Sequence, residues 1–301
     1  MTLWQNYIRP NNLPEVLDAF ATAPRPLLPI AGGTDLLLDL EQGRHPPVQT
    51  LVDVTSIVEL TRLEQRGDEL FIGAAVPVNR IVLDGLVGAH AQALVEACNL
   101  IAGPQVRNVA TLGGNVAHAL PAADGTIALL ALDAKAEIAG RVAERIETRR
   151  IPFRELFLGP GKSALKQGEE LIVGFYIKTS EVSETSEVSH TASCFKRIMR
   201  PQGVALPILN CAVWLERANG AVKDIRIAVG PGGGTPFRAT QAEYALRGRV
   251  LDETALESAL DALLAQAQFR TSARRASADY RRHIVSGLFR DVIESAWGRA
   301  G

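Results

Sequence analysis

Hydrophobic and polar residues alternate along this chain with two periods, one typical of helices and one typical of strands. The first fifty residues predict a β-α-β unit. Its helix starts after Asn12, a suitable N-cap, has Pro14 in the first turn and stops before Pro24. A buried strand, a short apolar helix and a second strand are then expected at residues 27–31, 34–41 and 48–54.

Short alternating strand segments begin at residue 60. The expected strands are residues 60–64, 69–74, 135–139, 145–151 and 171–177, with a turn at 66–68 and a hairpin formed by the third and fourth strands. The expected helices among them are residues 78–83, 90–99 and 124–132, with a loop over 101–108 that leads into residues 111–115.

Residues 179–193 are small, polar or acidic apart from valines, which predicts an exposed linker and a domain boundary. Beyond it, strands are expected at residues 194–198, 205–216 and 221–229, and helices at 239–246, 254–266 and 277–296. This order predicts a small antiparallel sheet backed by helices, an α+β arrangement.

Composition limits the classes of function. The 301 residues can form one large domain or two ordinary ones, and a net charge of −1 with 5% aromatic residues gives no reason to expect nucleic-acid binding. No apolar run is long enough for a membrane span and no signal peptide is visible, so we expect a cytoplasmic protein. Cys98, Cys194 and Cys211 are too few for a four-cysteine cluster and show no metal-ligand spacing, so no metal site is expected on this chain.

Two glycine motifs carry the candidate chemistry, at residues 31–35 (AGGTD) and 111–115 (TLGGN). Paired glycines allow a tight turn whose amides face outward with no side chain in the way, and such a concavity binds phosphate oxygens. One such turn is often only a connection between a strand and a helix. Because both are followed by an acid, Asp35 and Asp124, we interpret the pair as a pocket for an elongated diphosphate cofactor.

Further segments carry a family resemblance over nearly the whole chain. The matching segments are residues 30–36, 107–115, 121–124, 195–197, 226–230, 236–239 and 280–282. In order and spacing they resemble the FAD-binding (medium) subunit of the molybdenum hydroxylases, the family of xanthine dehydrogenase and aerobic carbon monoxide dehydrogenase.

The resemblance implies an α+β fold in two parts. The first is a PCMH-type FAD-binding domain, residues 1–178, with two subdomains at about 1–57 and 58–178 that clamp FAD between them. The second is a C-terminal CO-dehydrogenase-flavoprotein-like domain, residues 194–301, a small antiparallel sheet backed by helices that partly covers the flavin.

The same resemblance implies a set of FAD-binding residues. The first glycine loop is expected to wrap the pyrophosphate with its amides, and it consists of Pro29, Ile30, Ala31, Gly32, Gly33, Thr34, Asp35 and Leu36. Gly114 and Asn115, together with Gly113, are expected to lie against the cofactor. Thr111 would supply a hydroxyl contact, and Asp124 would accept from a ribose or ribityl hydroxyl.

Most of the other candidate residues have two interpretations each. His118 could donate to a phosphate or ribityl oxygen, or only cap its turn, and Ile101 could contact the adenine or belong to the core. Ile172 could cover one face of the flavin ring. Lys196, and less strongly Arg200, could stabilise negative charge on the reduced flavin, or be a strand-end charge in solvent or at a subunit seam.

The resulting hypothesis is an electron-transfer flavoprotein subunit with no catalytic residue of its own. The partners implied are a small subunit with [2Fe–2S] clusters and a large subunit with the molybdopterin cofactor, in a dimer of heterotrimers with an external electron acceptor. Two alternatives remain at this stage, a free-standing FAD-dependent oxidoreductase and a scaffold that has lost its cofactor. The intact glycines with Asp35 and Asp124 count against the scaffold.

Overall fold

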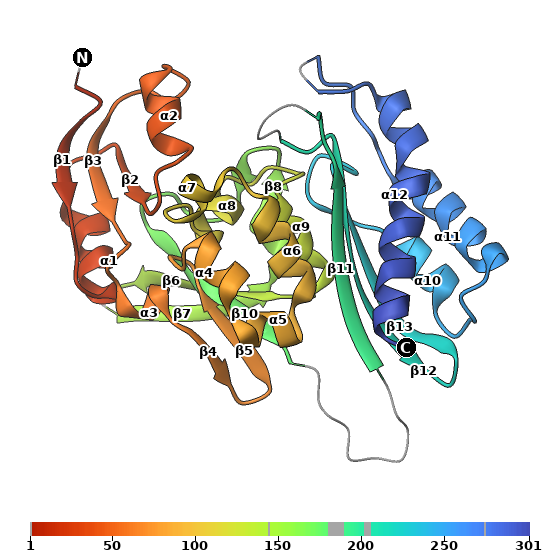
Figure 1. The fold of residues 1–301 in the computed structure, drawn as a ribbon. Helices are drawn as coiled ribbons and strands as arrows, with labels where there is room; N and C mark the ends of the chain where they lie inside the picture. The colour runs from red at the N-terminus through yellow and green to blue at the C-terminus, as the bar shows by residue number, and fades with distance from the viewer. Residues whose placement is uncertain (1, 144, 180–189, 202–205, 274) are drawn as a thin grey trace.

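Three main β-sheets lie in a row through the molecule, in the order of the sequence (Figure 1). The computed structural model describes residues 2–143, 145–179, 190–201, 206–273 and 275–301. Among the described residues, no helix has the length and apolar character needed to cross a membrane.

The first sheet is parallel and confirms the predicted β-α-β opening. Its strand order is β1-β3-β2, with β1 at Trp4–Ile8, β3 at Val48–Asp53 and β2 at Leu27–Ile30. Helices α1 (Leu13–Thr22) and α2 (Leu36–Glu41) connect these strands. The Asn12 side chain accepts a hydrogen bond from the Glu15 amide at 3.0 Å, so α1 begins where the sequence predicts.

The second sheet is antiparallel, in the order β4-β5-β10-β6-β7. Its strands are Leu63–Arg66, Glu69–Gly73, Glu170–Lys178, Lys135–Val142 and Arg145–Pro152, taken in the same order. The helices between β5 and β6 are α4 (Val78–Leu83), α5 (Gly85–His90), α6 (Gln92–Leu100), α7 (Pro104–Arg107), α8 (Leu112–Ala117) and α9 (Asp124–Ala131). After β7 come the short 3-10 helix Phe153–Leu156 and the small hairpin of β8 (Phe157–Gly159) and β9 (Lys162–Ser163).

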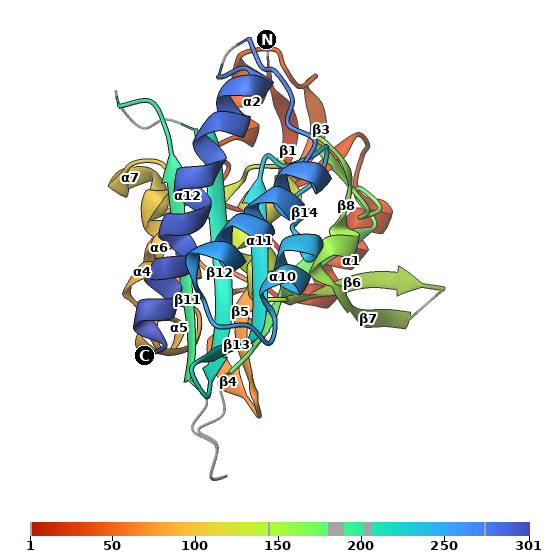
Figure 2. The same cartoon turned by 90° about the vertical axis from the view of Figure 1, so that its right-hand side faces the viewer.

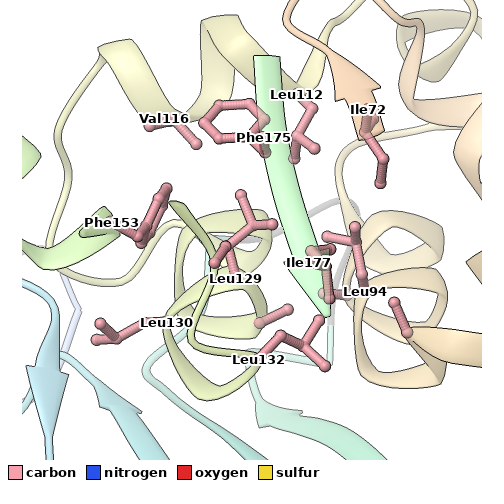
Figure 3. Close-up of a cluster of buried hydrophobic side chains, with 14 of the residues drawn as sticks. Ile72, Leu94, Leu112, Val116, Leu129, Leu130, Leu132, Phe153, Phe175 and Ile177 are labelled. Atoms are coloured by element: carbon pink, nitrogen blue, oxygen red, sulfur yellow. The ribbon is translucent and has the colours of Figure 1, made fainter. Parts of the chain in front are cut away.

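Strand β10 is buried on both faces because helices cover both sides of the second sheet. Phe175 and Ile177 belong to the main core, where Phe175 lies near Val116 and Ile177 lies near Leu94 (Figure 3), whereas Val173 and Tyr176 belong to the cluster beneath α1.

The third sheet is antiparallel, in the order β11-β12-β13-β14, and lies between two layers of helices (Figures 1 and 2). Its strands are His190–Ile198, Leu209–Ala218, Ala221–Gly230 and Phe237–Arg238. Helices α6 and α9 cover one face. On the other face lie α10 (Thr240–Leu246), α11 (Glu253–Gln266) and α12 (Ala278–Arg299). The predicted antiparallel sheet backed by helices is therefore confirmed.

Several predicted boundaries differ from the structure. Residues 58–61 form the short helix α3 (Val58–Thr61), so the strand expected from residue 60 starts at Leu63. The helix expected at 90–99 is two helices, α5 and α6, and the loop expected at 101–108 contains α7. In the expected linker, residues 190–193 belong to β11, and residues 180–189 lie outside the described residues. Residue 205, the predicted start of the next strand, also lies outside the described residues.

Candidate functional site

The first glycine motif connects β2 to α2 at the carboxyl end of an edge strand (Figure 1). Pro29 and Ile30 end the strand, and Leu36 begins the helix. Gly33 has a φ of 66°, in the left-handed region that glycine adopts without a Cβ clash. A Cβ on Gly32 would lie 2.1 Å from the carbonyl oxygen of Val109, so only glycine allows the loop to approach this segment.

The second glycine motif is the first turn of helix α8, so the expectation of a turn was wrong. The Thr111 hydroxyl accepts a hydrogen bond from the Gly114 amide at 3.1 Å and caps the helix. A Cβ on Gly113 would lie 2.5 Å from the Ala74 carbonyl oxygen, so this glycine lets α8 start against the backbone that follows β5. Gly113 therefore approaches protein, whereas Gly114 is exposed.

The first motif contacts the residues that flank the second motif on either side. Besides the approach of Gly32 to residues 109–110, His118 Nδ1 lies 3.4 Å from Asp35 Oδ2. His118 is the C-cap of α8, and Asp35 is the N-cap of α2. Their hydrogen bond raises the pKa of His118, against the opposing effect of burial, and lowers the pKa of Asp35. The two partners are far apart in the chain, so this contact leaves no signal in the sequence and was not predicted.

Backbone amides without protein partners lie in the first glycine loop. Within the described part of the chain, the amides of residues 32–35 donate to no acceptor, and Asp35 makes no side-chain cap for α2. The Asn115 Oδ1 atom also has no hydrogen-bond partner among the described residues, but it is buried beside Gly125 of α9. Free amides suit phosphate oxygens, so the first glycine loop fits the diphosphate of an elongated ligand.

Asp124 lies at the start of α9 and is buried against the third sheet. Its carboxylate accepts hydrogen bonds from Arg197 on β11 and from Asn210 Nδ2 on β12, the latter at 2.7 Å. Burial raises the pKa of Asp124, and the Arg197 charge opposes that shift. Arg197 and Asn210 were not predicted as site residues. Strand alternation in β11 could have indicated Arg197, because it puts Arg197 on the face of the sheet opposite to Lys196.

The remaining predicted residues lie in three different environments. Ile101 is the C-cap of α6 and packs, half-buried, against the main core, while Ile172 is buried in that core on β10. Lys196 Nζ contacts Asp291 and the Ser295 hydroxyl on α12. Among the described residues, no hydrogen bond or ion pair connects Ile101, Ile172 or Lys196 to the glycine motifs.

A pocket of about 650 Å³ lies beside Lys196. It is bordered by β11, by α12 and by Leu100, the residue before Ile101. Its polar lining is mixed, with Lys196, Arg197 and His283 beside Asp291. Lys196 and Leu100 at the end of α6 therefore line the same pocket, and no residue of the two glycine motifs lines it.

Comparison with known proteins agrees with this geometry. Residues 3–177 match the family described as the FAD binding domain in molybdopterin dehydrogenase, and residues 193–296 match the CO dehydrogenase flavoprotein C-terminal domain. This chain belongs to that family of FAD-binding domains. It is the flavoprotein component of an oxidoreductase, and FAD is its cofactor.

Individual relatives are similar over their whole length. The chain is 30% identical over 297 residues to the xanthine dehydrogenase FAD-binding subunit of Escherichia coli O157:H7, covering 98% of this chain and 97% of the relative. It is 31% identical to the nicotine 6-hydroxylase medium subunit of Paenarthrobacter nicotinovorans, covering 97% of each. A chain of the carbon monoxide dehydrogenase structure from Hydrogenophaga pseudoflava, in a form that lacks the Mo-pyranopterin moiety, superimposes with a TM-score of 0.90 at 27% identity, covering 99% of this chain and 98% of that chain. The predicted family and fold class are therefore confirmed.

Proposed function

We propose that this chain is the electron-transfer subunit of a multi-subunit molybdenum hydroxylase. In that role it receives electrons from [2Fe–2S] clusters of a partner subunit and passes them to an external acceptor. The observation that carries the proposal is the first glycine loop, which lies against residues 109–110 and whose amides at residues 32–35 lack protein partners among the described residues. Bound FAD supplies the redox chemistry, since a flavin accepts electrons singly and releases them as a pair.

The chain's own residues bind and orient that cofactor. The amides of the first glycine loop bind the diphosphate, and Thr34 adds a hydroxyl donor. Gly114 leaves its position on α8 without a side chain, and the half-buried Asn115 follows it on the same helix and is proposed to lie against the cofactor. The Thr111 hydroxyl can still donate its proton to the cofactor, because only its oxygen takes part in the helix cap.

Residues farther from the glycine motifs are proposed to serve the other parts of FAD. Ile101 and Ile172 offer apolar contact area to the ring systems, and Lys196 places a cation near the pocket beside α12. Asp124 uses its two oxygens for Arg197 and Asn210 but retains lone pairs for a ribose or ribityl hydroxyl.

We also propose the domain division and the partners. Residues 1–178 form the FAD-binding domain and residues 194–301 the C-terminal domain, which the two family matches support. The chain's three cysteines cannot provide the four protein ligands of a cluster. The clusters therefore belong to a small partner subunit and the molybdenum cofactor to a large one, in a cytoplasmic dimer of heterotrimers.

The protein purified from its native host tests this function. We expect an absorption spectrum with about one FAD per chain, together with a co-eluting iron–sulfur subunit and a molybdenum subunit. FAD without partner chains would favour the free-standing oxidoreductase. A folded chain that cannot take up FAD would overturn the assignment.

Substitution of Gly114 by valine tests the position of the cofactor. Gly114 is exposed and a Cβ there meets only Thr111 Oγ1, at 3.2 Å, so the fold has room for the side chain but the cofactor does not. We expect FAD affinity to fall by about tenfold or more, equivalent to at least ~1.4 kcal/mol, measured by fluorescence titration of the apoprotein.

Gly88→Val is the matched control. Gly88 lies in α5, a helix of the same length as α8, and a Cβ there meets no atom within 4 Å. Both substitutions make the same change in helix propensity. Equal FAD affinity in the two variants would contradict the placement of the cofactor against α8.

A further inference from the structure

His118 and Asp35 form a charged link between the two halves of the cofactor site. His118 ends α8 and Asp35 precedes α2, and the side chains meet at 3.4 Å while Gly32 packs against residues 109–110. The Asp35 amide is one of the donors without a partner, so the Asp35 carboxylate belongs to the same residue that offers an amide to the diphosphate.

A carboxylate beside a diphosphate is electrostatically unfavourable. The charged groups that face His118 are Asp35, Asp39 and Arg44. Arg44 Nε lies 3.1 Å from Asp39 Oδ1, so these two offset one another. Arg44 also acts on Asp35 from a distance, but His118 makes the direct contact with the Asp35 carboxylate and neutralises it only when its imidazole is protonated.

We propose that protonated His118 neutralises Asp35 at the mouth of the diphosphate site, so that FAD binding is linked to proton uptake by His118. This inference rests on the proposed function, in which FAD binds at the glycine motifs. The proton comes from solvent and binds an imidazole nitrogen, with no other bond formed or broken. His118 is thereby a positioning residue, which keeps Asp35 and α2 in place for an anionic ligand.

The direction of the linkage follows from charge. Asp35 already holds the pKa of His118 above its ordinary value. A diphosphate bound at the neighbouring amides adds negative charge and raises this pKa further. FAD therefore binds most tightly at a pH where His118 is already protonated in the free protein. The affinity for FAD falls as the pH rises from the pKa of His118 in the free protein to its pKa in the complex.

Calorimetric titration of the full-length apoprotein with FAD measures the linkage directly. Titrations in PIPES and in Tris, buffers with different ionisation enthalpies, give the number of protons taken up between about pH 6 and pH 8.5. We expect the wild type to take up a fraction of a proton per FAD, and its dissociation constant to rise by up to about tenfold per pH unit within the linked range.

Three variants separate a charge effect from a structural one. His118→Asn keeps a hydrogen-bond donor for Asp35 but cannot titrate, so its proton uptake should be lost. Asp35→Asn should move the uptake to lower pH, because it removes the group that raises the pKa of His118. His190→Asn, at an exposed position at the start of β11, should behave like the wild type.

The outcomes distinguish this inference from the proposed function. Stoichiometric FAD binding with the same proton uptake in wild type and His118→Asn would overturn the linkage and leave the cofactor site intact. Failure of the folded wild-type apoprotein to bind FAD would overturn the proposed function and the linkage with it.

Discussion

Asp124 and Arg197 are buried together where α9 meets the third sheet, with side chains only 5% and 6% exposed. A buried pair of this kind contributes little net stability, but removing one partner leaves an uncompensated charge. Asn210 also donates to Asp124, so the cluster ties the start of α9 to two strands of the third sheet. The cluster therefore lies at the contact between the two parts of the chain and holds them together there.

Arg197→Met should destabilise the apoprotein by about 3–5 kcal/mol near neutral pH. Arg197 opposes the upward shift of the Asp124 pKa, so its removal raises that pKa further. A carboxyl whose folded-state pKa exceeds its unfolded value loses its stabilising contribution as the pH rises through the folded-state pKa. Urea unfolding should therefore show a smaller loss at about pH 5 than at about pH 8.

The double variant Arg197→Met with Asp124→Asn is the control for the buried charge. Because it removes the unpaired carboxylate, it should recover part of the lost stability and show no additional loss at high pH. The same loss at both pH values in Arg197→Met would show that the destabilisation comes from lost packing.

At the scale of elements, the start of α8 shows how one motif serves two purposes. Thr111 caps the helix, Gly113 meets the backbone carbonyl of Ala74, and Gly114 faces outward. The two adjacent glycines are therefore required by different neighbours. Gly113 is required by protein packing, and Gly114 is proposed to be required by the cofactor.

Alanine at each glycine should separate these two roles. Gly113→Ala places a Cβ 2.5 Å from a carbonyl oxygen, so we expect a loss of about 1–3 kcal/mol in the free energy of unfolding. Gly114→Ala gains helix propensity and meets only the Thr111 hydroxyl oxygen, so its stability should change by less than about 1 kcal/mol. Equal destabilisation of the two apoproteins in urea would contradict the packing role of Gly113.

At the scale of the whole molecule, the main hydrophobic core crosses the predicted domain boundary. Phe195, Ala212 and Ala228 of the third sheet belong to the same cluster as Leu94 of α6 and Ile127 of α9. Helices α6 and α9 thus cover the second sheet and also contact the third. We expect the two parts to unfold together rather than as independent domains.

Phe195→Ala tests this shared core. Phe195 is 2% exposed, so loss of its ring should lower the free energy of unfolding by about 3–5 kcal/mol. Tyr244→Ala deletes a ring that is 78% exposed and serves as the matched control, with little change expected. Separate transitions for the two parts of the wild-type chain in denaturant would contradict a shared core.

Local patterns in the sequence were sufficient for much of the fold. The capped start of α1, the antiparallel strands of the third sheet and its covering helices follow from periodicity and turn residues. Short helices such as α3 and α7 were missed because each is a single turn, too short for a helical period, and is held by tertiary contacts. The glycine motifs were found as sites of close approach, but the helical conformation of the second one was not.

The sequence by itself determined the order of most of the longer elements, the family and the two segments proposed to meet FAD, because these depend on residues that are neighbours in the chain. Tertiary structure alone decided which distant groups meet. It brought His118 to Asp35, Arg197 to Asp124 and Gly32 to Val109. Such pairs leave no local signal, since each partner is an ordinary residue in its own segment and acquires its role only when packing removes water and places a charge or a carbonyl beside it.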